Sequence, residues 1–374
     1  MVERRRRVVL LLAAVALVGP ALAATSGQAG ARAPASDWTE IVHGHPAGQD
    51  SYLYDSWSDG VNVWAAGTRR ISVGGTYEWR TWVQKCAGSS CTLQNTRDVE
   101  AAPAYTFIEG VTGTSATDVW IAGYAKAPQS TTGTLVEHFD GATWSIVPTP
   151  IPNGGLWGIS AASGSDVWAV GSDSSDFSDS PVALHWNGAA WSVDPVRLKG
   201  CRGSDPLWDV DATGRRPLAV GACVNSHGDE QAMIISRRAH GWHLDKITGI
   251  DPTTFDLKSV DWTGTTAWAG GSTTSGAVVL RLRHGTWKPV TVPTGPGGVY
   301  GFAGDNAKDV WAVGILGSYG WMTMHWDGTG WTLVEDPGSG WLESVTRTAD
   351  GTPWAVGQKL GMSLIQRYDG ALSP

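Results

Sequence analysis

The chain has 374 residues, of which 42% are hydrophobic and only 17% charged, and its 49 glycines and 22 tryptophans exceed average usage. This composition excludes a disordered chain and a coiled coil. The formal net charge of -8 argues against nucleic acid and anionic lipid as partners, because both are themselves negatively charged.

The first 23 residues have the pattern of a secretory signal peptide. Residues 4–7 are four arginines, residues 8–18 form an apolar run, and residues 21–23 read ALA, an A-x-A cleavage pattern. The apolar run is too short to span a bilayer, so no membrane insertion is expected. We expect a signal peptide over residues 1–23, a flexible leader over residues 24–36, and a secreted, extracellular protein.

Four cysteines are an even number, which in an oxidising compartment favours two disulfides. Three pairings are possible. We favour Cys86 with Cys91 as a tight loop staple, and Cys201 with Cys223 because both fall in loops on one face of a single repeat. Neither pair has CxxC spacing and no histidine cluster accompanies them, so we expect no metal and no cofactor.

A hexapeptide recurs along the chain. Near-identical copies occupy residues 118–123 (DVWIAG), 166–171 (DVWAVG) and 309–314 (DVWAVG). With four weaker copies there are seven, spaced by 43 to 56 residues. Each is marked by a Trp, or by Leu in one copy, and the markers are Trp64, Trp120, Trp168, Leu218, Trp268, Trp311 and Trp354.

A second repeated element follows the marker. Residues 138–144 (HFDGATW), 185–191 (HWNGAAW) and 325–331 (HWDGTGW) place Asp-Gly or Asn-Gly between two β-rich runs, a strong hairpin signal. Each unit is then four short strands, and units of four strands at a period near 50 residues are typical of propeller blades. The sequence predicts an all-β, seven-bladed β-propeller of four-stranded blades.

The two ends of the chain complement each other. The seventh unit lacks its outer Trp strand, whereas residues 37–42 (DWTEIV) match that strand and stand alone before the first unit. We expect the N-terminal strand to pair into the last blade and close a propeller over residues 37–374, which removes exposed sheet edges.

Most tryptophans have a structural explanation on this map. Six are markers, and seven are predicted to begin outer strands: Trp38, Trp82, Trp144, Trp191, Trp242, Trp287 and Trp331. His138, His185 and His325 share one template position in three different blades. They cannot converge on one metal, so a structural hydrogen bond is expected for each.

The DVWAVG and HWDGxxW units resemble the repeats of secreted bacterial β-propellers, common in actinobacteria, within the WD40-like and kelch-like group. The resemblance covers about residues 37–368 and implies the fold more than an activity, since propellers host lectins, scaffolds and enzymes alike. It also suggests a lectin-like or target-binding subunit of an extracellular complex, such as the propeller components of umbrella-type toxin particles.

Long, variable segments are predicted to share one face of the propeller, where binding normally occurs. They are residues 68–76, 84–103, 124–134, 172–180, 195–206 and 222–229. Aromatic residues on inner strands line the predicted central channel, where a Trp face can stack on a sugar ring. The candidate platforms are Trp157, Trp208, Tyr300 and Trp341, with Asp209 and Glu343 as polar partners; filling gaps between blades is the alternative for each.

The chain carries no GxSxG, HExxH or P-loop motif. Residues 140–144 (DGATW) are similar to a sialidase Asp box but lack the residue between Asp and Gly. We therefore expect no catalytic residues and a recognition module that binds an extracellular glycan, or a secreted or cell-surface protein, as a possible subunit of a larger secreted complex. A protein scaffold without glycan binding, or a cryptic glycoside hydrolase, remains the alternative.

Overall fold

The structure, a computed structural model, describes residues 37–41, 50–97, 105–126, 132–175, 180–201, 204–293, 295–317, 320–334 and 338–370. Ser36–Pro374 form one compact unit. The predicted signal peptide and leader lie outside the described residues.

Four sheets have four antiparallel strands each. They consist of β10 (Gly154–Ser163), β11 (Asp166–Asp173), β12 (Ser180–Trp186) and β13 (Trp191–Val193); β14 (Ser204–Asp211), β15 (Leu218–Val224), β16 (Glu230–Arg238) and β17 (Gly241–Leu244); β23 (Gly297–Asn306), β24 (Asp309–Leu316), β25 (Gly320–Trp326) and β26 (Trp331–Leu333); and β27 (Trp341–Arg347), β28 (Pro353–Lys359), β29 (Met362–Tyr368) and β1 (Trp38–Glu40).

Two sheets are larger. The first has five strands, of which β18 pairs parallel with β22, and a short 3-10 helix η1 (Pro252–Thr254) lies between β18 and β19 in the chain. Its strands are β19 (Phe255–Thr263), β20 (Thr266–Thr273), β21 (Ala277–Arg283), β22 (Thr286–Pro289) and β18 (Lys246–Ile247). The other has eight strands: β2 (Ser51–Ser58), β3 (Val63–Val73), β4 (Thr76–Ala87), β5 (Ser90–Leu93), β6 (Tyr105–Ser115), β7 (Asp118–Lys126), β8 (Thr132–Phe139) and β9 (Trp144–Ile146).

The all-β propeller is confirmed, but the expectation of seven four-stranded blades is wrong. Hydrogen bonding gives five sheets of four or five strands, which are five separate blades, and one sheet of eight strands. The cause is the long β3–β4 hairpin, which brings Trp79 into a parallel bridge with Tyr105 at the start of β6. Two copies of the repeat thereby share one sheet.

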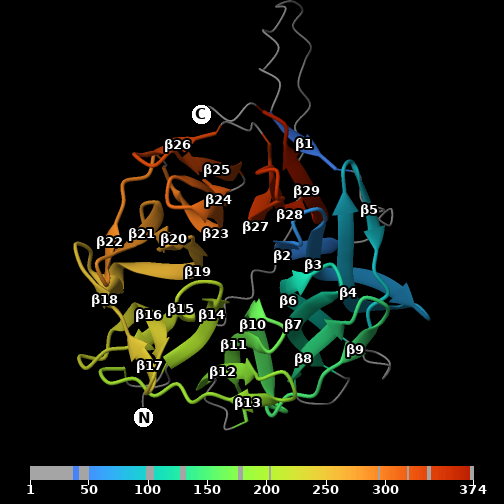
Figure 1. Cartoon of the computed structure of the whole chain (residues 1–374), viewed down its shortest axis with the longest axis horizontal. Coiled ribbons are helices and arrows are strands. Elements are labelled where there is room, and N and C mark those ends of the chain that lie inside the picture. The colour runs from blue at the N-terminus through green and yellow to red at the C-terminus, as the bar shows by residue number, and fades with distance from the viewer. Residues whose placement is uncertain are drawn as a thin grey trace, which may run out of the picture. The chain divides into compact units, whose positions relative to one another are not determined.

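The first strand of each repeat lies nearest the centre of the ring (Figure 1). In sequence order β2, β6, β10, β14, β19, β23 and β27 each contact the next, and β27 contacts β2. The N-terminal strand β1 pairs antiparallel with β29, with Trp38 opposite Tyr368, so the predicted closure is confirmed. Seven hydrophobic clusters fill the spaces between neighbouring repeats.

The repeated histidines make the expected structural contacts. The imidazole Nε2 of His138 lies 2.7 Å from Oδ1 of Asp118, the first residue of the marker hexapeptide, and the His138 ring stacks on Trp120 at 4.0 Å between centroids. The indole N–H of Trp120 donates to the same carboxylate at 3.0 Å. Aspartate, tryptophan and histidine therefore lock the second strand to the third in this repeat, and the same His–Asp pair occurs at His185 and His325.

The first repeat departs from the predicted template. Trp82, expected to begin an outer strand, lies in the third strand β4 and is fully buried. The outer strand is β5, joined to β4 through a hairpin in which Cys86 pairs with Cys91. Other repeats place an aromatic pair at this corner, as Trp186 faces Trp191. In the first repeat a disulfide takes the place of that aromatic pair. A template based on Trp positions does not detect this replacement.

Candidate ligand-binding site

Each of the seven first strands contains a β-bulge at the same register, and the bulge presents one residue. A bulge leaves that residue out of the ladder and re-aims its side chain. We call these seven residues the central ring: Tyr54, Glu109, Trp157, Trp208, Lys258, Tyr300 and Glu343. Six are half-buried and Lys258 is exposed.

The residue before each bulge anchors the strand. It is aliphatic and at most 1% exposed in every repeat, as at Leu156 before Trp157. Since neighbouring side chains of a strand point to opposite faces, burial of this residue directs the ring residue away from the core. These anchors are Leu53, Ile108, Leu156, Leu207, Leu257, Val299 and Leu342.

The bulge explains why the marker hexapeptide ends in glycine, since the bulged strand leaves no room for a side chain there. A Cβ atom on Gly171 would lie 2.0 Å from the carbonyl oxygen of Gly155, two residues before Trp157. The marker glycines Gly123 and Gly314 show the same close approach, at 1.9 and 2.0 Å. The motif that defines the repeat is thus tied sterically to the feature that displays the central ring.

The ring brings two carboxyl groups near each other. Loss of solvation through burial, together with the charge of Glu343, raises the pKa of Glu109 to about 8. Burial likewise raises the pKa of Glu343 to about 7, while the Lys258 ammonium lowers it in part. Glu109, Lys258 and Glu343 belong to β6, β19 and β27, so the electrostatic interactions of Glu343 with Glu109 and with Lys258 extend across the ring.

A continuous run of aromatic rings leads outward from the central ring over the first repeats. We call it the aromatic belt; neighbouring ring centroids are 5.0 to 6.3 Å apart. In order, its members are Tyr54, Tyr52, Trp79, Phe107, Tyr124, Trp157 and Trp208. All are half-buried, which leaves part of each ring accessible. Lys258 continues the run, with its Nζ 4.3 Å from the centroid of Trp208.

The structure brings four of the six candidate residues into the central ring: Trp157, Trp208, Tyr300 and Glu343. Trp341 lies two residues before Glu343, half-buried and outside the belt.

Asp209 has a different role. Its carboxylate accepts hydrogen bonds from the backbone N–H of Val210 at 2.7 Å and of Val260 at 2.8 Å, so it ties β14 to β19. Burial raises its pKa to about 8, against the effect of the Val260 hydrogen bond. Asp55 makes the equivalent bond to the N–H of Val111. Asp209 is therefore engaged in contacts between repeats.

Sequence reasoning missed three ring members, Tyr54, Glu109 and Lys258, because it selected tryptophans outside the repeat template, with one tyrosine and the carboxylates beside two of them. A positional signal was present. Every ring residue lies ten or eleven positions before its marker, as Lys258 precedes Trp268 and Glu109 precedes Trp120. The belt residue Trp79 carried no such signal, since only the bending of the β3–β4 hairpin places it over β6.

Both predicted disulfides are confirmed, Cys86 with Cys91 and Cys201 with Cys223. Cys223 lies in strand β15 rather than in a loop. Parts of the predicted long segments are also strands, since residues 84–87 belong to β4 and residues 90–93 to β5.

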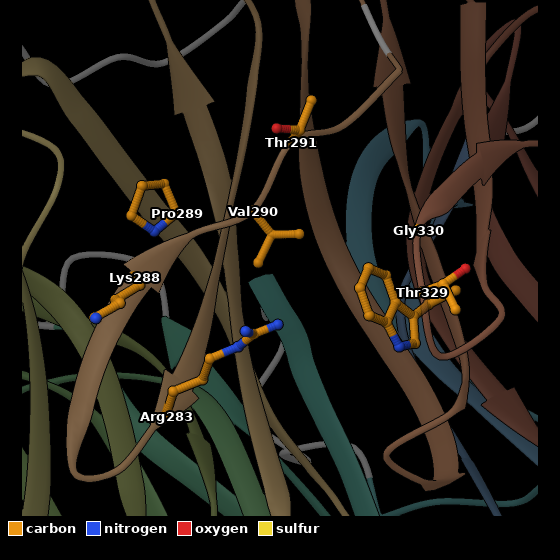
Figure 2. Close-up of a pocket in the computed structure, with 8 residues that line it drawn as sticks. Arg283, Lys288, Pro289, Val290, Thr291, Thr329 and Gly330 are labelled. Carbon is orange, nitrogen blue, oxygen red and sulfur yellow. The ribbon is translucent and has the colours of Figure 1, made fainter.

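A pocket of about 360 Å³ lies elsewhere, between the β21–β22 hairpin and the turn after β25. Figure 2 shows the guanidinium of Arg283 reaching toward the space between Val290 and Thr329, whereas Lys288 points away from it. Trp326 is only 2% exposed, so the pocket offers little aromatic surface. It is a weaker candidate than the central ring and the belt.

Within the described ranges, no group of three or more His, Cys, Asp or Glu side chains is arranged to hold a metal ion. Among the same residues, no helix is long and apolar enough to cross a membrane.

No protein-family model matches the chain, and no curated protein matches it in sequence. Solved propellers are similar in fold. A structure described as YCF48 bound to D1 peptide has a TM-score of 0.56 and 13% identity and covers 91% of this chain and 99% of its own. The WD40 β-propeller domain of Doa1 has a TM-score of 0.52 and 13% identity, covering 88% and 95%. A Hadza microbial sialidase is similar at 10% identity, over 86% of this chain and 65% of its own, with a TM-score of 0.45. The likeness to the first two structures shows the propeller fold alone.

Proposed function

We propose that this protein is a secreted, non-catalytic recognition module that binds an extracellular glycan through the central ring and the aromatic belt. The observation that carries the proposal is the belt itself, seven half-buried rings in contact from Tyr54 to Trp208. Aromatic faces stack on the C–H faces of sugars, and the carboxyls and phenols of the ring supply groups for sugar hydroxyls.

The proposal includes the export of the chain. Two disulfides are typical of an oxidising extracellular compartment. If residues 1–23 are a signal peptide, N-terminal sequencing of the secreted protein will begin at Ala24; a mature chain that retains residues 4–7 would contradict this.

Protein recognition is the second candidate. It is favoured by the likeness of fold to a propeller that binds a peptide and to a WD40 domain. A role as the target-binding subunit of a secreted complex, toxin complexes included, is compatible with either ligand class. Affinity purification from the native culture medium separates these cases, because a subunit will bring a stoichiometric partner with it.

The test of glycan recognition uses aromatic variants on a glycan array. Trp157→Ala and Trp208→Ala should each lose retention of the bound glycan at least tenfold while circular dichroism stays unchanged, because each removes a stacking face. Tyr77→Ala is the matched control, since Tyr77 is an exposed aromatic residue outside the belt. A blank array for the unaltered protein, or equal loss in the control, would overturn the proposal. Release of sugar from bound glycans would instead make the protein a hydrolase.

A further inference from the structure

The chemistry of the central ring points to one kind of sugar. Glu109 and Glu343 lie deep among protein atoms, yet part of each side chain reaches solvent, and within the described residues neither carboxyl makes a hydrogen bond. Two carboxyls that repel each other hold protons that a cationic ligand would displace. The Lys258 ammonium offsets the charge of Glu343 only in part, so the acidic pair favours a further positively charged group.

The aromatic members of the ring favour the same charge. Lys258 already places its ammonium 4.3 Å from the centroid of Trp208, which demonstrates that an ammonium fits this aromatic face. Trp157 lies beside Trp208, with centroids 6.0 Å apart, and Tyr54 and Tyr300 belong to the same ring. Indole and phenol faces attract cations through their quadrupoles, most strongly for Trp.

The net charge has the same sign. The chain as a whole carries a formal charge of -8, which attracts a cationic ligand and repels an anionic one. The neighbouring carboxyls of Asp55, Asp209 and Asp261 add little to this charge, because burial raises the pKa of each and favours the protonated form.

We propose that the central ring selects glycans that carry a protonated primary amine, as unacetylated amino sugars do, over neutral glycans of the same length. This inference rests on the proposed glycan-binding function. Glu109 and Glu343 contact the ammonium, Trp157 and Trp208 stack on the sugar, and Lys258 opposes binding as a built-in competitor for the same charges.

The test compares the glucosamine tetramer with the N-acetylglucosamine tetramer by isothermal titration calorimetry. The amine form should bind at least tenfold more tightly to the unaltered protein. Glu343→Gln should remove this preference by weakening binding of the amine form at least tenfold more than binding of the N-acetylated form, whereas Lys258→Gln should increase the preference. Opposite effects of two charge changes exclude a merely structural role, and Arg283→Gln, at the distant pocket, is the control with no expected effect.

Each contrary result has a distinct meaning. Equal or tighter binding of the N-acetylated tetramer overturns the amine proposal and leaves glycan recognition standing. Binding of neither tetramer, together with a blank glycan array, overturns both. Binding of tetralysine without either tetramer, lost in Glu343→Gln, supports the ring's cation chemistry but overturns its assignment to a glycan.

A pH series tests the same two carboxyls through the affinity for the ligand. With an N-trimethylated glucosamine tetramer, whose charge is fixed, affinity should increase from pH 6 to pH 8.5 as the two carboxyls lose their protons. Glu109→Gln and Glu343→Gln should each flatten this rise. A flat profile for the unaltered protein would overturn the proposal.

Discussion

The marker glycine connects the repeat motif to the site at the scale of single residues. Gly171→Ala should lower the free energy of unfolding by about 3 kcal/mol, because its Cβ would lie 2.0 Å from the Gly155 carbonyl oxygen and force the bulge to shift. Chemical denaturation measures the loss. Gly330→Ala, where a Cβ meets nothing within 4 Å, should change stability by less than about 0.5 kcal/mol, and equal effects of the two substitutions would contradict this account.

Glu109 predicts a dependence of stability on pH. Its carboxyl has a pKa of about 8 in the folded protein, against a reference value of 4.5. Between these values the folded state binds more protons than the unfolded state, so the free energy of unfolding should fall as pH rises from about 4.5 to about 8. Glu109→Gln should flatten this slope and raise stability at pH 8. Denaturation at pH 5 and pH 8 measures both, and an unchanged slope would rule out a raised pKa at this position.

The residues of the site differ in how far the sequence predicted them. Trp157, Trp208 and Tyr300 could be placed because inner strands were recognisable and these aromatic residues lay on them, and Glu343 because it lies beside Trp341 in the sequence. Lys258 carries no chemical hint of a ring position by itself. Its role depends on the bulge and on Trp208 beneath its ammonium, and both are set by contacts between strands.

At the scale of elements, the β4–β5 hairpin shows how one repeat replaces an aromatic corner with a covalent bond. Cys86→Ala combined with Cys91→Ala should cost about 2 kcal/mol, the chain entropy of so short a loop. Cys86→Phe combined with Cys91→Trp should recover part of that loss, since Phe139 faces Trp144 at the same position in the second repeat. Thermal denaturation of both double variants checks this, and no recovery would mean that the two corners are not equivalent.

The long β3–β4 hairpin explains why the repeat pattern misjudged the sheets. The template assigned Trp82 to an outer strand because a Trp begins that strand in other repeats. In the structure the hairpin extends to Val73 and Thr76, Trp82 pairs opposite Gly67, and the outer strand follows later. The length of a hairpin depends on which strands pair with it, and this pairing cannot be predicted from the local sequence.

At the scale of the whole molecule, closure of the ring depends on one short strand. Trp38 is 5% exposed and packs edge to face against Trp311 and Tyr368, with centroids 5.7 and 5.4 Å apart. Trp38→Ala should lower the free energy of unfolding by about 3 to 5 kcal/mol, because it leaves a cavity where the last repeat meets the N-terminal strand.

The control for ring closure lies on the same strand. Glu40→Ala removes only an exposed ion pair with Lys359 and should cost less than about 1 kcal/mol. Chemical denaturation compares the two variants. If Trp38→Ala lowered the free energy of unfolding no more than Glu40→Ala, strand β1 would not be what holds the ring closed.

The sequence by itself determined the all-β propeller fold, the closure of the ring and both disulfides, because each depends on local patterns that recur: a buried marker strand, a tight hairpin, paired cysteines and one unmatched end strand. Only the tertiary structure decided which side chains meet. Seven bulges converge on the centre of the ring, and the β3–β4 hairpin places Trp79 between Tyr52 and Phe107. These contacts join residues far apart in the chain, and their geometry follows from strand pairing and packing between repeats, which local sequence does not encode.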